Sequence, residues 1–145
     1  MTESCQAESL YLVHVSAGLL VNDREELLLV RKHGTSRFMQ PGGKREPGES
    51  PDETLVRELR EELGLLAEEA SLRPIGRFRA PAANEPDHVV VAHCYLLRLS
   101  NEESERVAGQ SEIAEAVWVD LATALTLPLA PLTKDFLLPL LEQAP

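Results

Sequence analysis

The segment from Ser50 to Gly64 constrains the fold more than any other part of the chain, because it carries the start, one face and the end of a helix. Ser50 stands at the N-cap position, Pro51 at the first helical position and Glu53 at the third, which together form a capping box. Gly64 suits a left-handed cap at the other end. The apolar face between these ends consists of Leu55, Val56, Leu59 and Leu63. This stripe predicts a helix that packs against a sheet.

Three glutamates occupy a second face of this helix, because Glu58, Glu61 and Glu62 are spaced at i, i+3 and i+4. Clustered carboxylates repel one another, and a hard divalent cation such as Mg²⁺, which prefers oxygen ligands, explains the cluster. Glu49, just before the helix, could reach the same place, and Arg57 could hold one carboxylate by a bidentate pair. The alternative interpretation is a solvated acidic face in which arginines pair with glutamates one turn away.

The whole segment Gly43–Leu65 (GKREPGESPDETLVRELREELGL) resembles the Nudix box, the signature of a superfamily that hydrolyses nucleoside diphosphates linked to another group. The fixed positions of the signature are filled by Gly43, Glu49, Arg57, Glu58, Glu61, Glu62 and Gly64. A chance match is on the order of 10⁻⁸ per window, so the resemblance is specific to the superfamily. It implies the Nudix fold, a mixed β-sheet sandwiched between α-helices, whereas periodicity alone indicates only an α/β or α+β protein.

The resemblance also implies metal-assisted attack of water on a phosphorus atom of a diphosphate. Mg²⁺ is the expected cofactor, with Mn²⁺ as the alternative. The metal ligands that it implies are Glu58, Glu62, Glu61, Glu49 and the backbone carbonyl of Gly43. Glu61 is alternatively a base acting through water, and Arg57 is expected to orient a carboxylate at the site.

The general base varies in position across this superfamily and is often a glutamate outside the box. Glu85 lies in a loop between two predicted strands, where substrate loops often occur. Glu112 and Glu115 precede Trp118 in the segment SEIAEAVWVD, a kind of segment that many Nudix proteins carry near the site. The alternative is that each is a surface glutamate, because a catalytic base must also satisfy a geometry that the sequence does not contain.

Candidate substrate-binding residues lie outside the box. Arg77 and Arg79 alternate with Phe78, so both could meet phosphates from one face of a strand, although edge-strand arginines are also commonly solvated. Phe38 could stack on a base, although aromatic residues in strands more often belong to the core. Gly43 allows close approach of the backbone. The expected substrates are a canonical or oxidised nucleoside triphosphate, ADP-ribose or a sugar nucleotide.

Length and charge limit the remaining possibilities. The 145 residues predict one domain, 1–145, with residues 1–8 as a flexible tail. A net charge of −10 argues against a general nucleic-acid surface, but it permits a nucleotide substrate because bound metal ions reverse the local sign. The chain has no apolar run of about 18 residues and no basic apolar leader, so we expect a cytoplasmic protein without a membrane span.

Two alternatives to a hydrolase stay open. One is a module that binds a nucleotide without catalysis, although such members usually have degraded boxes. The other is isomerisation of an isoprenoid diphosphate, for which Cys94 would have to be the catalytic cysteine, although its apolar run favours a core residue. Cys5 lies in the polar N-terminal stretch. Many relatives pair as dimers, so a homodimer is also an expectation.

The rest of the chain alternates between predicted strands and helices. The predicted strands are 10–21, with an irregularity at Gly18, 26–31, 72–78, 89–99 and 116–119. Asn22-Asp23 predicts the turn of a hairpin. Asp120 is predicted to cap a helix over 121–125, and Thr133 a last helix through Leu141. The charged segment 101–110 is predicted to be a loop.

Overall fold

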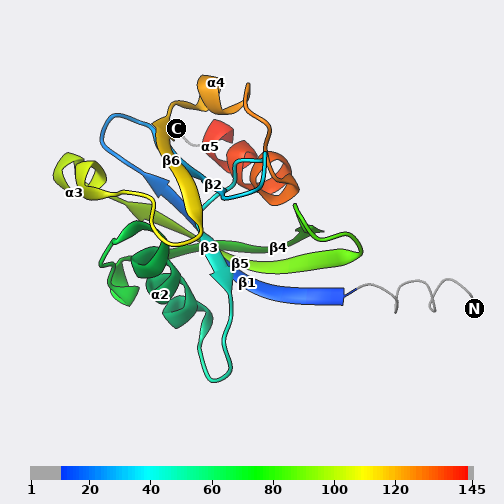
Figure 1. The fold of residues 1–145 in the computed structure, drawn as a ribbon. Helices are drawn as coiled ribbons and strands as arrows, with labels where there is room; N and C mark the ends of the chain where they lie inside the picture. Colours follow the sequence, from blue (N-terminus) through cyan, green and yellow to red (C-terminus); the bar gives the residue numbers. More distant parts are fainter. Residues whose placement is uncertain (1–10, 144–145) are drawn as a thin grey trace, which may run out of the picture.

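The computed structural model describes residues 11–143, in which strands and helices alternate along the chain (Figure 1). The strands are β1 (Tyr11–Val21), β2 (Leu27–Lys32), β3 (Gly42–Lys44), β4 (Arg73–Pro81), β5 (His88–Arg98) and β6 (Ile113–Val119). The helices are α2 (Pro51–Leu63), the 3₁₀ turn η1 (Glu69–Ser71), α3 (Asn101–Arg106), α4 (Leu121–Ala124), the π-helical stretch η2 (Thr133–Leu137) and α5 (Leu138–Gln143). Among the described residues, no helix is long and apolar enough to cross a membrane.

The strands form one mixed six-stranded sheet in the order β4-β5-β1-β2-β6, with β3 paired to β1 outside this path. β1 and β5 are parallel, and the other pairs are antiparallel. β1 pairs with β2 only at its end, where Val21 opposes Leu27, and it pairs with β3 between Val15 and Ala17. β2 therefore leaves β1 after the hairpin, and β3 takes its place beside β1.

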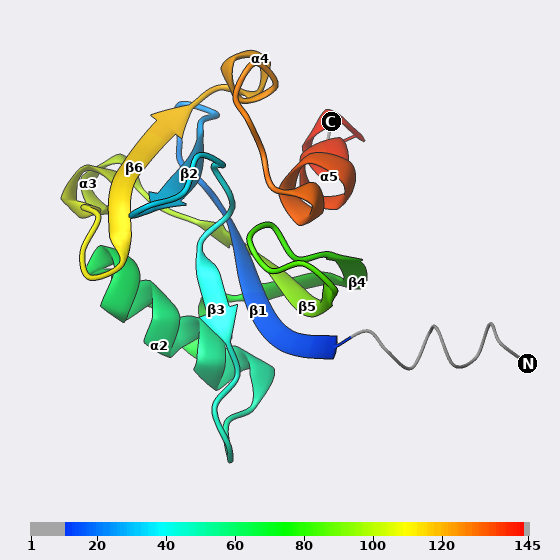
Figure 2. The same ribbon diagram turned by 45° about the vertical axis from the view of Figure 1, so that its right-hand side comes forward.

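Helices cover both faces of this sheet, with α2 on one side and α4 and α5 on the other (Figures 1 and 2). Side chains of β2 alternate between the two layers, as the period of a strand requires. Leu28 and Val30 pack with the three leucines of α2, whereas Leu27 and Leu29 pack with Leu138 of α5. Burial of each such leucine stabilises the fold by about 1.5–3 kcal/mol. The predicted mixed sheet between helices is confirmed.

Two expectations about the second half of the chain are wrong. The predicted loop 101–110 contains α3, which begins with a capping box in which Ser100 and Glu103 exchange hydrogen bonds. Thr133 does not cap the last helix, because the N-cap of η2 is Leu132 and Thr133 lies inside the helical stretch. The hydroxyl of Thr133 instead bonds to Gln40, far away in the sequence.

Most strand predictions hold, with shifted ends. The pairing of β1 with β5 runs without interruption through Gly18, so the predicted irregularity is absent from the described strand. The strands predicted at 72–78 and 116–119 are longer, as β4 and β6. The hairpin turn at Asn22-Asp23 and the Asp120 cap of α4 are confirmed. The expected tail 1–8, with Cys5, and the first residue of the predicted strand, Leu10, lie outside the described residues.

Candidate active site

Helix α2 forms as predicted and presents its glutamates away from the core. Ser50 and Glu53 exchange both bonds of the capping box, and Gly64 adopts the left-handed cap with φ 67°. The leucines of the apolar stripe are completely buried, with exposed fractions of 0%. The rotation of the helix is therefore set by its core face, which fixes where Glu58, Glu61 and Glu62 project.

Glu62 is the most deeply buried of the three glutamates, with only 6% of its surface exposed. Its Oε1 accepts a hydrogen bond from the backbone N–H of Gly42 at 3.1 Å. Burial raises the pKa of Glu62 to about 8, and the nearby carboxylates of Glu58 and Glu112 act in the same direction, against the Gly42 bond and Lys32. A carboxylate held in this way favours the arrival of a positive charge.

Arg57 connects the box in the way that the sequence predicts. Its guanidinium forms a bidentate pair with Glu49, with Nε–Oε2 and Nη2–Oε1 distances of 2.6 and 3.0 Å. It also donates to Glu58 at 2.9 Å, to Glu61 at 3.2 Å and to the carbonyl of Lys44 at 3.0 Å. The Arg57 pair lowers the pKa of Glu49 to about 2, so this carboxylate stays charged and orients the arginine.

Two consecutive glycines bring β3 against both β1 and α2. A Cβ on Gly42 would lie 2.1 Å from the carbonyl oxygen of Ser16, and its φ of 142° belongs to glycine. A Cβ on Gly43 would lie 2.4 Å from the carboxyl carbon of Glu58. The absence of side chains here lets the Glu58 carboxyl group lie directly against the backbone, and burial raises its pKa.

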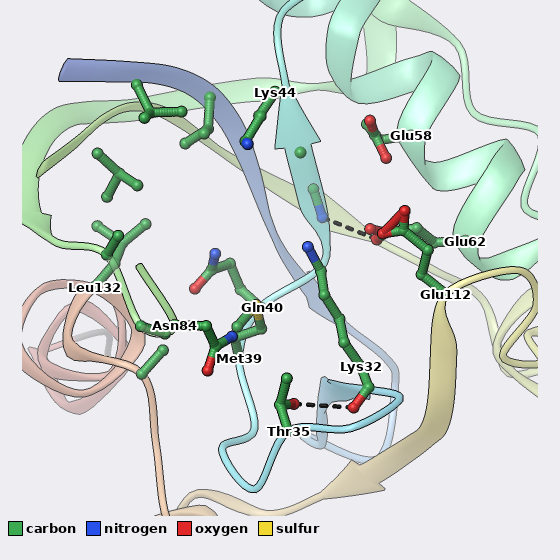
Figure 3. A pocket seen from close by; sticks show the side chains of 18 of the residues that line it. Lys32, Thr35, Met39, Gln40, Lys44, Glu58, Glu62, Asn84, Glu112 and Leu132 are labelled. Atoms are coloured by element: carbon green, nitrogen blue, oxygen red, sulfur yellow. Dashed lines mark hydrogen bonds between the residues drawn. The ribbon is translucent and has the colours of Figure 1, made fainter. Parts of the chain in front are cut away.

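The two glycines and the three glutamates of α2 line a cavity of about 780 Å³, within the range of roughly 300–1,000 Å³ that is usual for ligand pockets. Glu58, Glu62 and Glu112 lie on one side of it and Leu132, Asn84 and Gln40 on the other, with Lys32 between them (Figure 3). The acidic wall is Glu58, Glu61, Glu62 and Glu112. The apolar wall is Val13, Val15, Met39, Val90, Ala130 and Leu132.

The candidates outside the box fall into two groups. Glu85 and Glu112 line the cavity, and the Glu85 carboxylate lies 3.7 Å from the Lys44 ammonium group. Glu115 is not among the cavity-lining residues, because its side chain pairs with Arg31 at 2.8 Å across β2 and β6. Glu115 lies within β6, whereas Glu112 precedes this strand and Glu85 lies in the loop between β4 and β5.

The predicted substrate-binding residues other than Gly43 do not reach this cavity. Arg77 and Arg79 are exposed on the edge strand β4. Phe78, between them, packs against Phe136 of η2, so the two arginines point to the face of the sheet that carries α2. Phe38 packs in the core beside α5 and bridges to Leu129. These positions agree with the alternatives of solvated and core residues.

Several cavity residues escaped the sequence analysis. They are Lys32, Gln40, Lys44 and Asn84. Lys44 directly follows the two glycines, so its place inside the box was a usable signal. Lys32, Gln40 and Asn84 come from separate strands and loops, and only the folded chain brings them together.

Comparison with known proteins identifies the family. The NUDIX domain family matches residues 12–140 of this chain.

The chain belongs to the NUDIX family.

The relatives of the chain are named for several different activities. Over 121 residues the chain is 29% identical to the uncharacterized Nudix hydrolase YvcI of Bacillus subtilis, covering 83% of this chain and 74% of YvcI. It is 34% identical over 64 residues to an 8-oxo-dGTP diphosphatase of Escherichia coli, covering 41% of this chain and half of that enzyme. It is 36% identical over 75 residues to an ADP-ribose pyrophosphatase of Methanocaldococcus jannaschii, covering 50% of this chain and 43% of that enzyme.

Solved structures agree on the fold. The NUDIX domain of Shewanella oneidensis NrtR, determined with ADP ribose, superposes with a TM-score of 0.71 over 99% of this chain and 96% of that domain. Its sequence identity is 21%, so this likeness concerns the NUDIX fold alone.

The oxygen atoms of the acidic wall suit a hard divalent cation as ligands. All its side-chain donors are carboxylate oxygens, and the buried Glu62 accepts only the Gly42 bond within residues 11–143. In that part of the chain no three His, Cys, Asp or Glu side chains already surround one point. Glu58 and Glu61 are instead hydrogen-bonded to Arg57. To bind a cation, their carboxylates would have to leave this guanidinium or contact both at once.

The raised pKa of Glu62 predicts how the stability of the protein depends on pH when a chelator keeps metal ions away. The unfolded chain ionises near the ordinary value of 4.5 and the folded chain near 8, so the free energy of unfolding falls as pH rises between these values. Glu62→Gln removes the free-energy cost of ionising a buried carboxyl group and keeps the hydrogen bond from Gly42. We expect this variant to exceed the wild type at pH 8 by a few kcal/mol, on the order of 1.4 kcal/mol per pKa unit, and to match it near pH 4.5.

Urea denaturation across this pH range measures the effect. Glu68→Gln, at an exposed position outside the cavity, removes the same formal charge and is the matched control. Parallel stability curves for Glu62→Gln and the wild type would show that Glu62 ionises normally in the folded protein.

Proposed function

We propose that this NUDIX chain is a divalent-metal-dependent pyrophosphohydrolase that cleaves a diphosphate bond of a small nucleotide. The chain is a hydrolase of the class that acts on phosphorus-containing acid anhydrides. The observation that carries the proposal is one cavity in which an acidic wall and an apolar wall face each other across lysines (Figure 3). An anionic diphosphate with a cation suits the first wall, and a nucleoside suits the second.

Mg²⁺ is the proposed cofactor, with Mn²⁺ as the alternative. The proposed ligands are Glu58 and Glu62, with Glu61 and the Gly43 carbonyl as further donors. Glu49 is already occupied by Arg57, the Thr54 hydroxyl and the backbone of Glu46, so its main proposed role is to hold Arg57. The bound ion would neutralise charge on the diphosphate oxygens and lower the pKa of the attacking water.

The residues of the chain then divide the remaining work. Lys32 and Lys44 carry the positive side chains that line the cavity, and we assign them to the phosphate oxygens. Arg57 holds Glu58 and Glu61 in position from one side. The apolar wall excludes water from the nucleoside and leaves the diphosphate at the acidic wall.

Glu112 is the proposed acceptor for the proton of the attacking water. It lines the cavity beside Glu62, whereas Glu85 faces Lys44 and Glu115 pairs with Arg31 (Figure 3). General-base catalysis contributes about 10²–10⁴-fold. Glu112→Gln should therefore lower kcat by about 10²-fold, while Glu115→Gln leaves it within about twofold. Equal effects of the two substitutions would exclude this role.

A hydrolysis screen of the purified protein with Mg²⁺ or Mn²⁺ tests the proposed function. The panel contains canonical and oxidised nucleoside triphosphates, ADP-ribose and sugar nucleotides, with identification of the products. Pyrophosphate and a monophosphate from one triphosphate would identify a nucleotide-pool hydrolase. Two monophosphates from a diphosphate-linked substrate would identify an ADP-ribose type of activity. Absence of metal-dependent turnover throughout would favour the non-catalytic alternative.

The isomerase alternative loses its support in the structure. Cys94, its required nucleophile, is 1% exposed in the core beneath α5 and does not line the cavity. Burial raises the pKa of the thiol to about 12, so it stays protonated at neutral pH.

A further inference from the structure

The side-chain amide of Gln40 is held in one orientation by a residue from the far end of the chain. Thr133, in η2, is completely buried with 0% of its surface exposed. Its hydroxyl oxygen accepts the backbone N–H of Gln40 at 3.3 Å, and its hydroxyl proton is donated to the Oε1 of Gln40 at 2.6 Å. The buried hydroxyl proton needs an acceptor, and the Oε1 of Gln40 is the acceptor that the structure places within reach, so this contact turns the oxygen end of the amide toward Thr133.

This arrangement leaves the nitrogen end of the amide to the cavity. Gln40 lines the cavity, and its Nε2 has no hydrogen-bond partner within residues 11–143. In Figure 3 this nitrogen points toward the open centre of the cavity, and the oxygen turns toward the helix that follows Leu132. Gln40 therefore presents a fixed donor to any ligand that enters.

The surroundings of this donor suit a flat, partly apolar group. Val15, Val90 and Leu132 belong to the apolar wall of the same cavity, and Asn84 adds a second amide to its lining. The acidic wall lies across the cavity (Figure 3). If the diphosphate is held at the acidic wall, as the proposed function requires, the base of the nucleotide lies at Gln40.

We propose that Gln40, oriented by Thr133, donates a hydrogen bond to an exocyclic carbonyl oxygen of the nucleobase. The site would then prefer bases with an oxo group, as in 6-oxopurines, over bases with an amino group at the same position. An amino group would place two donors against each other and leave the amide unpaired. This proposal rests on the proposed function, because it takes the acidic wall as the diphosphate site.

Inosine and adenosine triphosphates test the proposal, because they differ by an oxo and an amino group at position 6. We expect the wild type to favour the inosine nucleotide in kcat/KM by about 10–100-fold, the usual effect of leaving one hydrogen-bonding group unpaired. Thr133→Val removes the hydroxyl at similar volume and frees the amide to turn, and Gln40→Met removes the amide. Both variants should bring the ratio to within about threefold of one.

Controls separate recognition of the base from the catalytic step. Thr126→Val changes a hydroxyl just after α4 that bonds to the carbonyl of Thr123, and it should leave the ratio unchanged. Gln40→Met keeps the proposal testable if Thr133→Val fails to fold, because Gln40 is only half-buried. Turnover of inorganic tripolyphosphate, which has no base, should be equal in the wild type and in Gln40→Met.

Each outcome has a defined meaning. A wild-type preference for the adenosine nucleotide, or an unchanged ratio in both variants, would overturn the role of Gln40. If the wild type hydrolyses neither nucleotide, the proposed function is in question. The same ratio is then measured as dissociation constants of the two triphosphates by calorimetry, and it decides the role of Gln40 independently.

Discussion

Replacing Glu62 with glutamine is expected to lower kcat by at least about 10²–10³-fold without loss of the fold. Glutamine has nearly the same shape and can still accept the hydrogen bond from Gly42. It cannot provide the negative charge that a divalent cation needs, in a place where burial excludes water as a substitute. The expected signature is therefore a large change in kcat together with normal folding.

Steady-state kinetics at several Mg²⁺ concentrations, with circular dichroism and thermal denaturation, measure this effect. Glu115→Gln is the matched control, because Glu115 lies on β6 in a pair with Arg31 and should lose no more than about twofold in kcat. The wild type should gain thermal stability from Mg²⁺, and Glu62→Gln should gain much less. Normal turnover by Glu62→Gln would remove Glu62 from the metal site.

Substituting alanine at Gly42 and at Gly43 is expected to give opposite results. Gly42→Ala places a methyl group 2.1 Å from the Ser16 carbonyl oxygen and 2.9 Å from the Ala17 Cα. Both atoms belong to the backbone of the central strand β1 and cannot move aside. The φ of 142° adds strain of about 1–3 kcal/mol. We expect Gly42→Ala to lower the free energy of unfolding by more than about 3 kcal/mol or to prevent folding.

Gly43→Ala meets a side chain instead of a backbone. The atoms nearest to its methyl group would be those of the Glu58 carboxyl group, at 2.4–2.8 Å, and Glu58 can turn away. Stability should then change by less than about 1 kcal/mol, as for most substitutions without a backbone clash. Activity should fall by more than about tenfold, because Glu58 leaves the position that it shares with Arg57.

Urea denaturation and kcat measured on the same preparations separate the two effects. Gly48→Ala is the control, because its φ of 85° also favours glycine but no atom lies within 4 Å of its Cβ. It should cost about 1 kcal/mol and leave kcat unchanged. Equal stability of the Gly42 and Gly43 variants would show that β3 adapts to a side chain at either position.

Local signals in the sequence were sufficient to predict helix α2, including both of its ends and its apolar face. The capping box at Ser50 and the cap at Gly64 act within one turn of the chain, so they are visible without tertiary contacts. The same signal at Ser100 and Glu103 begins α3, but the charged run after it lacks an apolar stripe. Periodicity therefore favoured a loop, and the cap was the better indicator.

The bidentate pair between Arg57 and Glu49 was also predictable, because both residues belong to one contiguous signature. The face of the sheet on which Arg77 and Arg79 lie was not. Their face follows from the register of β4 on β5 and from the packing of Phe78 against Phe136. Sequence alternation shows that two residues share a face, but it does not show which helix covers that face.

The sequence alone determined the family, the ends of α2 and the acidic face that carries Glu58, Glu61 and Glu62. These properties depend on residues within about twenty positions of one another, so local spacing encodes them. The tertiary structure alone decided that Lys32, Gln40 and Glu112 share one cavity with these glutamates and that Thr133 orients Gln40 across 93 positions. The departure of β2 from β1 and the packing of η2 against the sheet create these contacts. Such long-range contacts leave no periodic trace in the chain.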